Sequence, residues 1–289
     1  MIRLEYISSN GTTFDLLSWD GLKTETADYH NYKWGTNVAK KQYGEKINYF
    51  TKNAQTFKTT LLFRGPYATR RQKIDAFHFC TEYDIAHKTP GRIFWGDDYI
   101  ECYITSSDTK PRDDGATYTE NDIQIYAAYP FWIEEQTLSI MPSGGTSVRP
   151  TDKGYPQPRL GYPYLYSYPY APNASYMYVD HYMPCNFKMV VWGPAESVSI
   201  TIADHIYAVN HALRANQYMV IDSRPGIDPD RRCYIVSASG EITNVFDYRS
   251  PEHLLFQPIP SGDVIINYSR DYGVDLTVFK ERSEPRCLS

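Results

Sequence analysis

The stretch PGRIFWGDDYIECYITSSDTKPRDDGATYTENDIQIYAAYPFWIEE, from Pro90 to Glu135, is the part of this sequence that decides the fold. It predicts a turn, two strands, a polar loop and a third strand, because β-branched and aromatic runs alternate with turn residues. We expect the third strand to end in Tyr129, Pro130, Phe131 and Trp132, an apolar tip with one residue that cannot donate a ladder hydrogen bond; the last three are candidate interface residues. No recognisable catalytic constellation lies in this stretch. A well-marked sheet without one indicates assembly more than catalysis.

The composition of the whole chain favours interfaces over nucleic acid. The 289 residues suffice for one large or two ordinary domains. The sequence has 27 tyrosines against 12 phenylalanines and 5 tryptophans, and tyrosine suits half-wet interfaces as well as β-sheets in general. The net charge is −5 with both signs interspersed. Without a basic block we expect no specific binding of nucleic acid.

The chain carries no sign of export or of a membrane span. Its first residues lack a cationic start followed by an apolar core, so no secretory signal is predicted. No stretch approaches the roughly 20 apolar residues that cross a bilayer. The cysteines are odd in number and scattered, which predicts reduced thiols in a protein made in a reducing cytoplasm; they are Cys80, Cys102, Cys185, Cys233 and Cys287.

One helix is expected, over roughly residues 69–87. Thr69 followed by Gln72 has the spacing of a capping box, and Thr89-Pro90-Gly91 predicts the end. Apolar side chains recur on one face, which we expect to pack on the sheet: Ile74, Phe77 and either Cys80 or Thr81. The other polar residues are interpreted as the solvated side: Asp75, Glu82, Asp84 and His87.

The pattern predicts a mainly β chain in three parts. Residues 1–140 read as a β-rich domain with the one helix, and residues 184–289 as a β-sandwich of short strands, with the option that the last strand returns to the first domain. Residues 141–183 are rich in Pro and Tyr and predict an extended linker or arm. Tyr164, Tyr166 and Tyr168 alternate there, so an extended backbone would place their rings on one side. Together with the last three residues of the apolar tip they are our candidate interface residues.

No motif for catalysis, for a cofactor or for a metal is found. The GxxxxGK[ST], GxGxxG, HExxH and GxSxG patterns are all missing, and the histidines are dispersed. Acidic pairs such as Asp97-Asp98 and Glu134-Glu135 leave glycoside hydrolysis open in principle. Adjacent acids on a strand point to opposite faces, however, whereas a glycosidase needs two carboxyl groups across a cleft. We therefore predict a protein that is not an enzyme and has no cofactor or metal.

The order of the motifs resembles the distal tail proteins of long-tailed phages that infect Gram-positive bacteria. In the first half the resemblance is carried by Tyr83-Asp84-Ile85, Pro90-Gly91-Arg92, Trp95 to Ile100 and Pro130-Phe131-Trp132. In the second half it is carried by Trp192 to Ala195, Asp204 to Val209, Tyr218 to Ser223, Phe256 to Gly262, Gly273 to Thr277 and Glu281 to Arg286. Each motif is short, but their order covers nearly the whole chain. The chain departs from the family at Cys287, where the family often has an aromatic residue.

The resemblance implies a structural protein at the distal end of the phage tail. Its N-terminal domains would form a homo-hexameric ring around the tail channel, with galectin-like sandwiches on the outside. The ring would join the major tail tube protein to the tail-tip hub, close to the tape measure protein and a receptor-binding protein. The alternative function is a carbohydrate-binding module for adsorption to the host cell wall, indicated by the sandwich and by the tyrosines of the arm.

Overall fold

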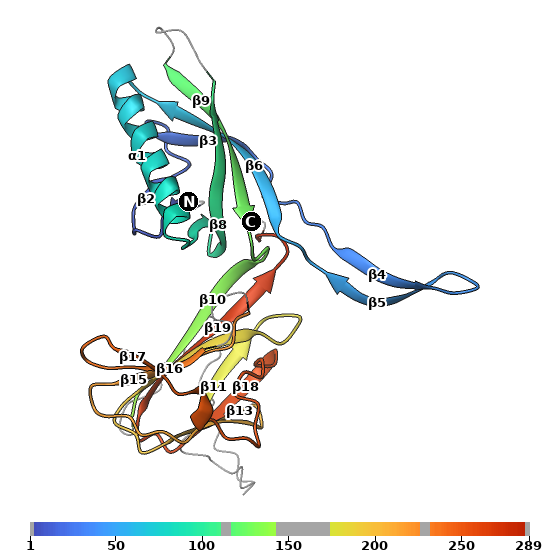
Figure 1. Cartoon of the computed structure of the whole chain (residues 1–289), viewed down its shortest axis with the longest axis vertical. Helices are drawn as coiled ribbons and strands as arrows, with labels where there is room; N and C mark the ends of the chain where they lie inside the picture. The colour runs from blue at the N-terminus through green and yellow to red at the C-terminus, as the bar shows by residue number, and fades with distance from the viewer. Residues whose placement is uncertain (1–2, 111–116, 143–173, 226–231, 287–289) are drawn as a thin grey trace, which may run out of the picture. The chain divides into compact units, whose positions relative to one another are not determined.

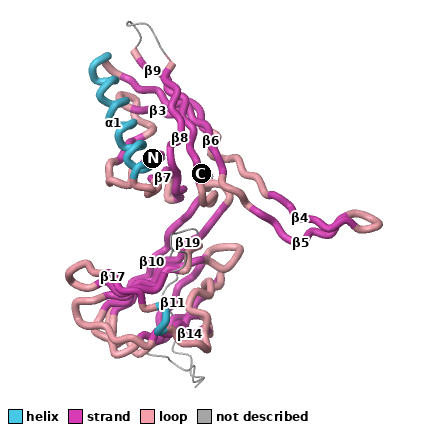
Figure 2. The backbone as a smooth tube through the Cα atoms, in the orientation of Figure 1, coloured by secondary structure: helices cyan, strands magenta, loops and turns pink. Residues whose placement is uncertain are grey.

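The computed structural model describes residues 3–110, 117–142, 174–225 and 232–286, and these are mainly β with one α-helix (Figures 1 and 2). The prediction of a mainly β chain with a single helix is confirmed. The chain divides into two compact units. The first consists of Met1–Glu134 with Glu281–Ser289, and the second of Glu135–Lys280.

The described part of the first unit contains eleven strands or parts of strands and the helix α1. Two strands are shared by both units: β10 (Trp132–Ile140) begins in the first and β19 (Gly273–Arg282) ends in it. The others, in chain order, are β1 (Leu4–Ile7), β2 (Thr13–Asp15), β3 (Leu22–Ala27), β4 (Gly35–Lys40), β5 (Glu45–Thr51), β6 (Gln55–Arg64), α1 (Tyr67–Ala86), β7 (Gly91–Trp95), β8 (Asp98–Thr109) and β9 (Tyr118–Ala127).

Strand β8 connects two sets of strands in this unit. Its first half pairs with β7, which leads on to β1 and β2, and its second half pairs with β9, which leads on to β6 and β3. A bulge lies in the second half, between Ile104 and Ser106. Because a bulge bends a strand and increases its twist, one long strand can serve both sets and enclose a common core.

The opening stretch folds largely as predicted, except at its tip. Strands β7, β8 and β9 are the expected three, and most of the polar loop before β9 lies outside the described residues. However, β9 already ends at Ala127, and Trp132 begins β10, so the apolar tip does not end the third strand. The backbone turns tightly there, since the Phe131 N–H donates to the Tyr129 carbonyl at 3.0 Å. Pro130, which lacks an N–H, fits this break between two ladders.

The helix is confirmed in position, but its start differs from the prediction. It runs over Tyr67–Ala86 with Pro66 at the N-cap and no side-chain cap, so Thr69 and Gln72 form no capping box. Proline with φ −57° already has the dihedral of a first helical turn, and this starts the helix two residues early. The predicted inner face is confirmed, because Ile74, Phe77 and Cys80 are buried.

The prediction for Asp84 is wrong. Asp75, Glu82 and His87 are exposed as expected, but Asp84 is 0 % exposed. Its carboxylate accepts hydrogen bonds from the Tyr6 hydroxyl, from the Ser8 hydroxyl at 2.7 Å, and from the Ser9 N–H and hydroxyl at 2.8 and 2.6 Å. Burial, and then the contact with Asp84, raise the pKa of Tyr6, so its phenol stays protonated and donates. This buried network joins the end of α1 to the chain after β1.

The second unit is a β-sandwich. Its strands are β11 (Ala174–Val179), β12 (Asn186–Trp192), β13 (Val198–Ile202), β14 (His205–Val209), β15 (Tyr218–Asp222), β16 (Arg232–Val236), β17 (Ile242–Asn244) and β18 (Gly262–Asn267), with a 3₁₀ turn η1 (Phe246–Tyr248). One sheet has the order β17-β16-β15-β12-β19-β10 and the other β11-β18-β13-β14. Inward side chains of both sheets share one core, with Met189 and Val191 facing residues such as Ile200. Strand β11 lies inside the range 141–183 that the sequence analysis assigned to a linker.

The chain re-enters the first unit at Glu281. There the Arg286 N–H donates to the Asp98 carboxylate at 2.7 Å, and the Arg286 guanidinium forms an ion pair with Glu134. Asp98 is only 2 % exposed. The Pro-basic pair before Cys287 is thus anchored on the first unit, and Cys287 itself lies outside the described residues.

Candidate interaction surfaces

The β4–β5 hairpin is the most exposed element of the first unit. The two strands form a separate two-stranded sheet, which extends away from the rest of its unit (Figure 1). Every residue from Thr36 to Thr51 is exposed. An isolated two-stranded hairpin is marginally stable in water, so this element is a candidate for burial against another molecule.

One face of the hairpin carries an apolar stripe. Thr36 is paired with Phe50, and Val38 with Ile47, so these four side chains share a face. Phe50 is 57 % exposed, Ile47 51 % and Val38 37 %. Single exposed apolar residues need no explanation, but a contiguous group on an unsupported hairpin marks an interaction site. The sequence analysis did not identify the stripe, because Ile47 and Phe50 are three residues apart and share a face only through the register shift between Asn37 and Val38.

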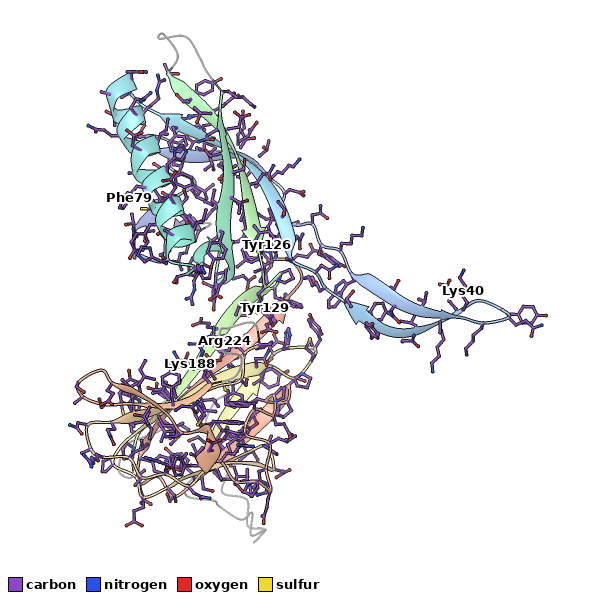
Figure 3. All side chains as sticks on the ribbon, in the orientation of Figure 1. Lys40, Phe79, Tyr126, Tyr129, Lys188 and Arg224 are labelled. Carbon is purple, nitrogen blue, oxygen red and sulfur yellow. The ribbon has the colours of Figure 1, made fainter. Side chains whose placement is uncertain are left out.

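The hairpin is also basic in an acidic chain. Residues 33–52 contain five lysines and one glutamate, a formal charge of +4. The chain as a whole carries −5, so the remaining residues carry −9. Near the tip, Lys40 (labelled in Figure 3) lies opposite Glu45 in the register of the two strands. The positive hairpin of one copy is therefore complementary in charge to the negative remaining residues of a second copy of the chain.

Lys52 lies at the base of the hairpin, surrounded by aromatic rings. Its Nζ is 4.4 Å from the ring centroid of Phe131, 5.5 Å from that of Trp34 and 5.9 Å from that of Tyr32. The Nζ has no hydrogen-bond partner among the described residues. Burial lowers the pKa of Lys52 to about 8, while the charge of Glu284 acts in the opposite direction. The cation–π contacts take the place of water and hold the hairpin base to the Phe131 turn.

The three candidate interface residues of the predicted apolar tip lie in different environments. Trp132 is 1 % exposed and packs edge-on against Tyr29 and Phe57 in the core. Pro130 is also buried. Phe131 is partly exposed, packs edge-on against Trp34 with ring centroids 6.2 Å apart, and contacts Lys52. Phe131 alone of the three therefore joins the surface of the hairpin base.

The other predicted interface residues, Tyr164, Tyr166 and Tyr168, lie outside the described residues. The structure does show exposed tyrosines on the strand that follows. Tyr176 and Tyr178 of β11 are 56 % and 60 % exposed. They alternate with Met177 and Val179, which are buried in the sandwich core.

A polar hollow lies over β3, β6, β8 and β9. Its volume is about 420 Å³, and residues such as Thr60, Lys110 and Asp122 line it. Lys110 Nζ is 2.9 Å from Asp122 Oδ2, and the Thr60 hydroxyl donates to Asp122 Oδ1 at 2.7 Å. The hydrogen bonds from Lys110 and Thr60 lower the pKa of Asp122. These charges neutralise one another and form no acid–base pair aimed at a substrate.

The described residues also contain no group of three His, Cys, Asp or Glu side chains that could hold a metal ion. Cys80, Cys102 and Cys233 are free and buried as predicted, and Cys185 is buried as well. Burial raises the pKa of Cys233 to about 12, which keeps its thiol protonated and unreactive. Within the described part of the chain, no helix has the length and hydrophobicity to cross a membrane.

Comparison with known proteins shows a likeness in fold. No family model matches the sequence, and no curated protein matches it. The Dit protein (gp 19.1) of phage SPP1, described as a paradigm of the hub adsorption apparatus in phages infecting Gram-positive bacteria, matches with a TM-score of 0.57 at 9 % identity. The match covers 98 % of this chain and 99 % of that chain.

Two structures of the phage P2 baseplate in its activated conformation match as well. The structure with calcium has a TM-score of 0.61 at 11 % identity, and the structure with strontium 0.61 at 10 %. Both matches cover 99 % of this chain and 100 % of the other. At such identities the likeness concerns the fold, and at that level the resemblance to distal tail proteins is confirmed. The chain has the fold of these phage hub and baseplate proteins over nearly its whole length.

Proposed function

We propose that this chain is a structural, non-enzymatic subunit of a phage tail tip. Six copies form a closed ring at the distal end of the tail in the virion. The ring joins the tail tube to the tail-tip hub and to the receptor-binding apparatus, and the sandwich of the second unit lies at its periphery. The fold shared with the SPP1 Dit protein and with the P2 baseplate supports the location; the partners and the number of copies follow by analogy of fold.

The observation that supports a ring most directly is the exposed β4–β5 hairpin. Its apolar stripe of Val38, Ile47 and Phe50 is exposed on two strands that pair with no third strand of the described residues. Burying these side chains removes apolar surface from water, which stabilises an assembly by about 25 cal/mol per Å². The charge of +4 on residues 33–52 and of −9 on the rest favours a second copy as the partner.

The geometry of such a contact favours a ring over a two-fold dimer. A hairpin that docks on a different part of the neighbouring copy makes a head-to-tail interface, in which the two contacting surfaces differ. Head-to-tail interfaces generate rings when the rotation between copies closes. A central channel for the tape measure protein, and later for DNA, follows from ring closure. The mildly acidic chain suits such a channel, because DNA would pass without being held.

The test compares two matched variants by light scattering and electron microscopy. Ile47→Asp places a charge in the hairpin stripe, and Ile242→Asp places one on the sandwich, where Ile242 is 67 % exposed. We expect the unmodified chain and Ile242→Asp to form six-fold rings. Ile47→Asp should lose them, because an unpaired carboxylate buried in an interface costs several kcal/mol, on the order of a thousandfold in affinity.

Two results would contradict the proposal. One is a chain that stays monomeric at high concentration and forms no ring on isolated tails. The other is a ring that persists unchanged in Ile47→Asp, which would remove the hairpin from the interface.

A further inference from the structure

Trp192 occupies an unusual position on the sandwich of the second unit. Strand β12 lies inside its sheet, between β15 and β19, and its inward residues Met189 and Val191 are 0 % exposed. Trp192 points to the opposite, outer face of the sheet and is 45 % exposed. A tryptophan that exposed on a central strand, away from the core, is not explained by the packing of the sandwich.

Contacts along its edges hold the indole ring in place. Trp192 Nε1 donates to Asp275 Oδ2 on β19 at 2.7 Å. Tyr218 on β15 packs on the other side, with ring centroids 5.0 Å apart and an angle of 43° between the planes. Gly273 is the residue directly opposite Trp192 on β19, and a Cβ there would already lie 3.5 Å from Trp192 Cδ1. The indole therefore lies close over a strand position without a side chain, fixed in orientation and still largely exposed.

Polar groups continue from Trp192 along the same face of the sheet. Register places Thr277 of β19 beside Lys188 of β12, the residue labelled in Figure 3. The Thr277 hydroxyl is 2.9 Å from the hydroxyl of Thr137. With Asp275, which contacts the indole, these residues form a row of a carboxylate, two hydroxyls and an ammonium that leads along the strands away from the exposed ring. The row offers both donors and acceptors.

We propose that the Trp192 platform, defined as Trp192, Tyr218, Asp275, Thr277 and Lys188, binds a pyranose ring of a saccharide. A pyranose has an apolar C–H face that packs on an aromatic ring and a rim of hydroxyl groups that needs donors and acceptors. A rigid aromatic surface with a few placed polar groups provides both. The proposal goes beyond the ring assembly and does not depend on it.

A saccharide fits this surface better than a protein or a nucleotide. A stable protein partner needs about 800 Å² on each side, whereas one indole with a polar row matches the size of one or two sugar rings. A nucleotide would bring its phosphate to the Asp275 carboxylate in a chain of net charge −5, which like-charge repulsion disfavours.

The test uses the indole N–H signals of the full chain in a ¹⁵N-correlated NMR spectrum. The chain has 5 tryptophans, and the signal lost in Trp192→Phe identifies Trp192. Maltotetraose, chitotetraose and galactotetraose are the probes. We expect at least one of them to shift the Trp192 signal saturably, with a dissociation constant on the order of 1 mM. Trp19, which is 67 % exposed in the first unit, is the internal control and should not shift.

Two variants separate binding from folding. Trp192→Ala should abolish the saturable shifts of the neighbouring signals while the other indole signals keep their positions. Asp275→Asn keeps an acceptor for the indole N–H but loses the charge, and it should weaken binding about tenfold.

Three outcomes would overturn the proposal. The first is that none of the three probes shifts the Trp192 signal at concentrations on the order of 10 mM. The second is an equal shift of Trp19. The third is a Trp192 signal that moves with protein concentration in the absence of sugar, which would show a second copy on the platform.

Discussion

Replacement of Asp84 tests the largest difference between the sequence-based expectation and the structure. The carboxylate is 0 % exposed and accepts four hydrogen bonds. One of its oxygens accepts from Tyr6, and the other accepts from the Ser8 hydroxyl and from both the N–H and the hydroxyl of Ser9. We expect Asp84→Ala to destabilise the first unit strongly and Asp84→Asn to destabilise it much less.

The magnitude follows from what each substitution leaves behind. A hydrogen bond to a charged group contributes about 1.5–3 kcal/mol, and the donors that remain after removal of one partner cost further free energy. The four bonds are not additive, because three donors are hydroxyls that can rotate, so we expect about 3–5 kcal/mol for Asp84→Ala. Asparagine can keep the three bonds to one oxygen, and its NH₂ group can donate to Tyr6. A loss of about 1–2 kcal/mol is expected for Asp84→Asn.

Urea denaturation followed by tryptophan fluorescence measures this effect, since four of the 5 tryptophans lie in the first unit: Trp19, Trp34, Trp95 and Trp132. Asp75→Ala is the matched control, because Asp75 is exposed on the same helix. Its effect should stay within about 0.5 kcal/mol. A free energy of unfolding for Asp84→Ala within about 1 kcal/mol of the control would refute the argument. So would an asparagine variant as unstable as the alanine variant.

Two further predictions concern residues next to these networks. Gly91→Ala should destabilise the first unit by about 1–3 kcal/mol, because a Cβ would lie 2.7 Å from both Asp84 Oδ2 and the Tyr6 ring. Gly273→Ala should be tolerated in the same urea assay, because the nearest atoms to its Cβ would be 3.5 Å away or more. The pKa of Lys52 in the folded state is about 8, below its ordinary value of 10.5. Between pH 8 and 10.5 the folded state therefore binds fewer protons than the unfolded state. The free energy of unfolding should rise with pH across that window. Lys52→Met should lack this rise, and parallel stability curves for the two proteins from pH 7.5 to 10.5 would show the assignment to be wrong.

Elements with strong local signals were predictable from the sequence. Strand β6 alternates Phe57, Thr59 and Leu61 toward the core, which is the period of a half-buried strand. Ile74, Phe77 and Cys80 repeat with the period of a helix, and the structure buries them. The short strands of the sandwich were likewise visible, because turn residues separate apolar runs. In each case the information lies within a few residues of the chain.

Features that depend on distant contacts were not predictable. Asp84 follows Cys80 and Thr81 on the buried face of the helix, but its hydrogen-bond partner Tyr6 is 78 residues away in the sequence, and no local pattern identifies that partner. Trp132 was expected in an apolar tip at an interface, but Tyr29 and Phe57 enclose it in the core. Periodicity describes which side a residue faces, and it does not describe what covers that side.

The sequence by itself determined the class of fold, the single helix and the lack of any motif for chemistry, since all of these follow from local patterns and composition. Only the tertiary structure decided which surfaces remain uncovered. The runs that form β4 and β5 look like any hairpin, and their apolar stripe is exposed because no third strand from the described part of the chain joins them. Trp192 likewise becomes a platform only when β19 places Gly273 and Asp275 beside it. Exposure depends on the packing of segments far apart in the chain, and a local pattern cannot contain it.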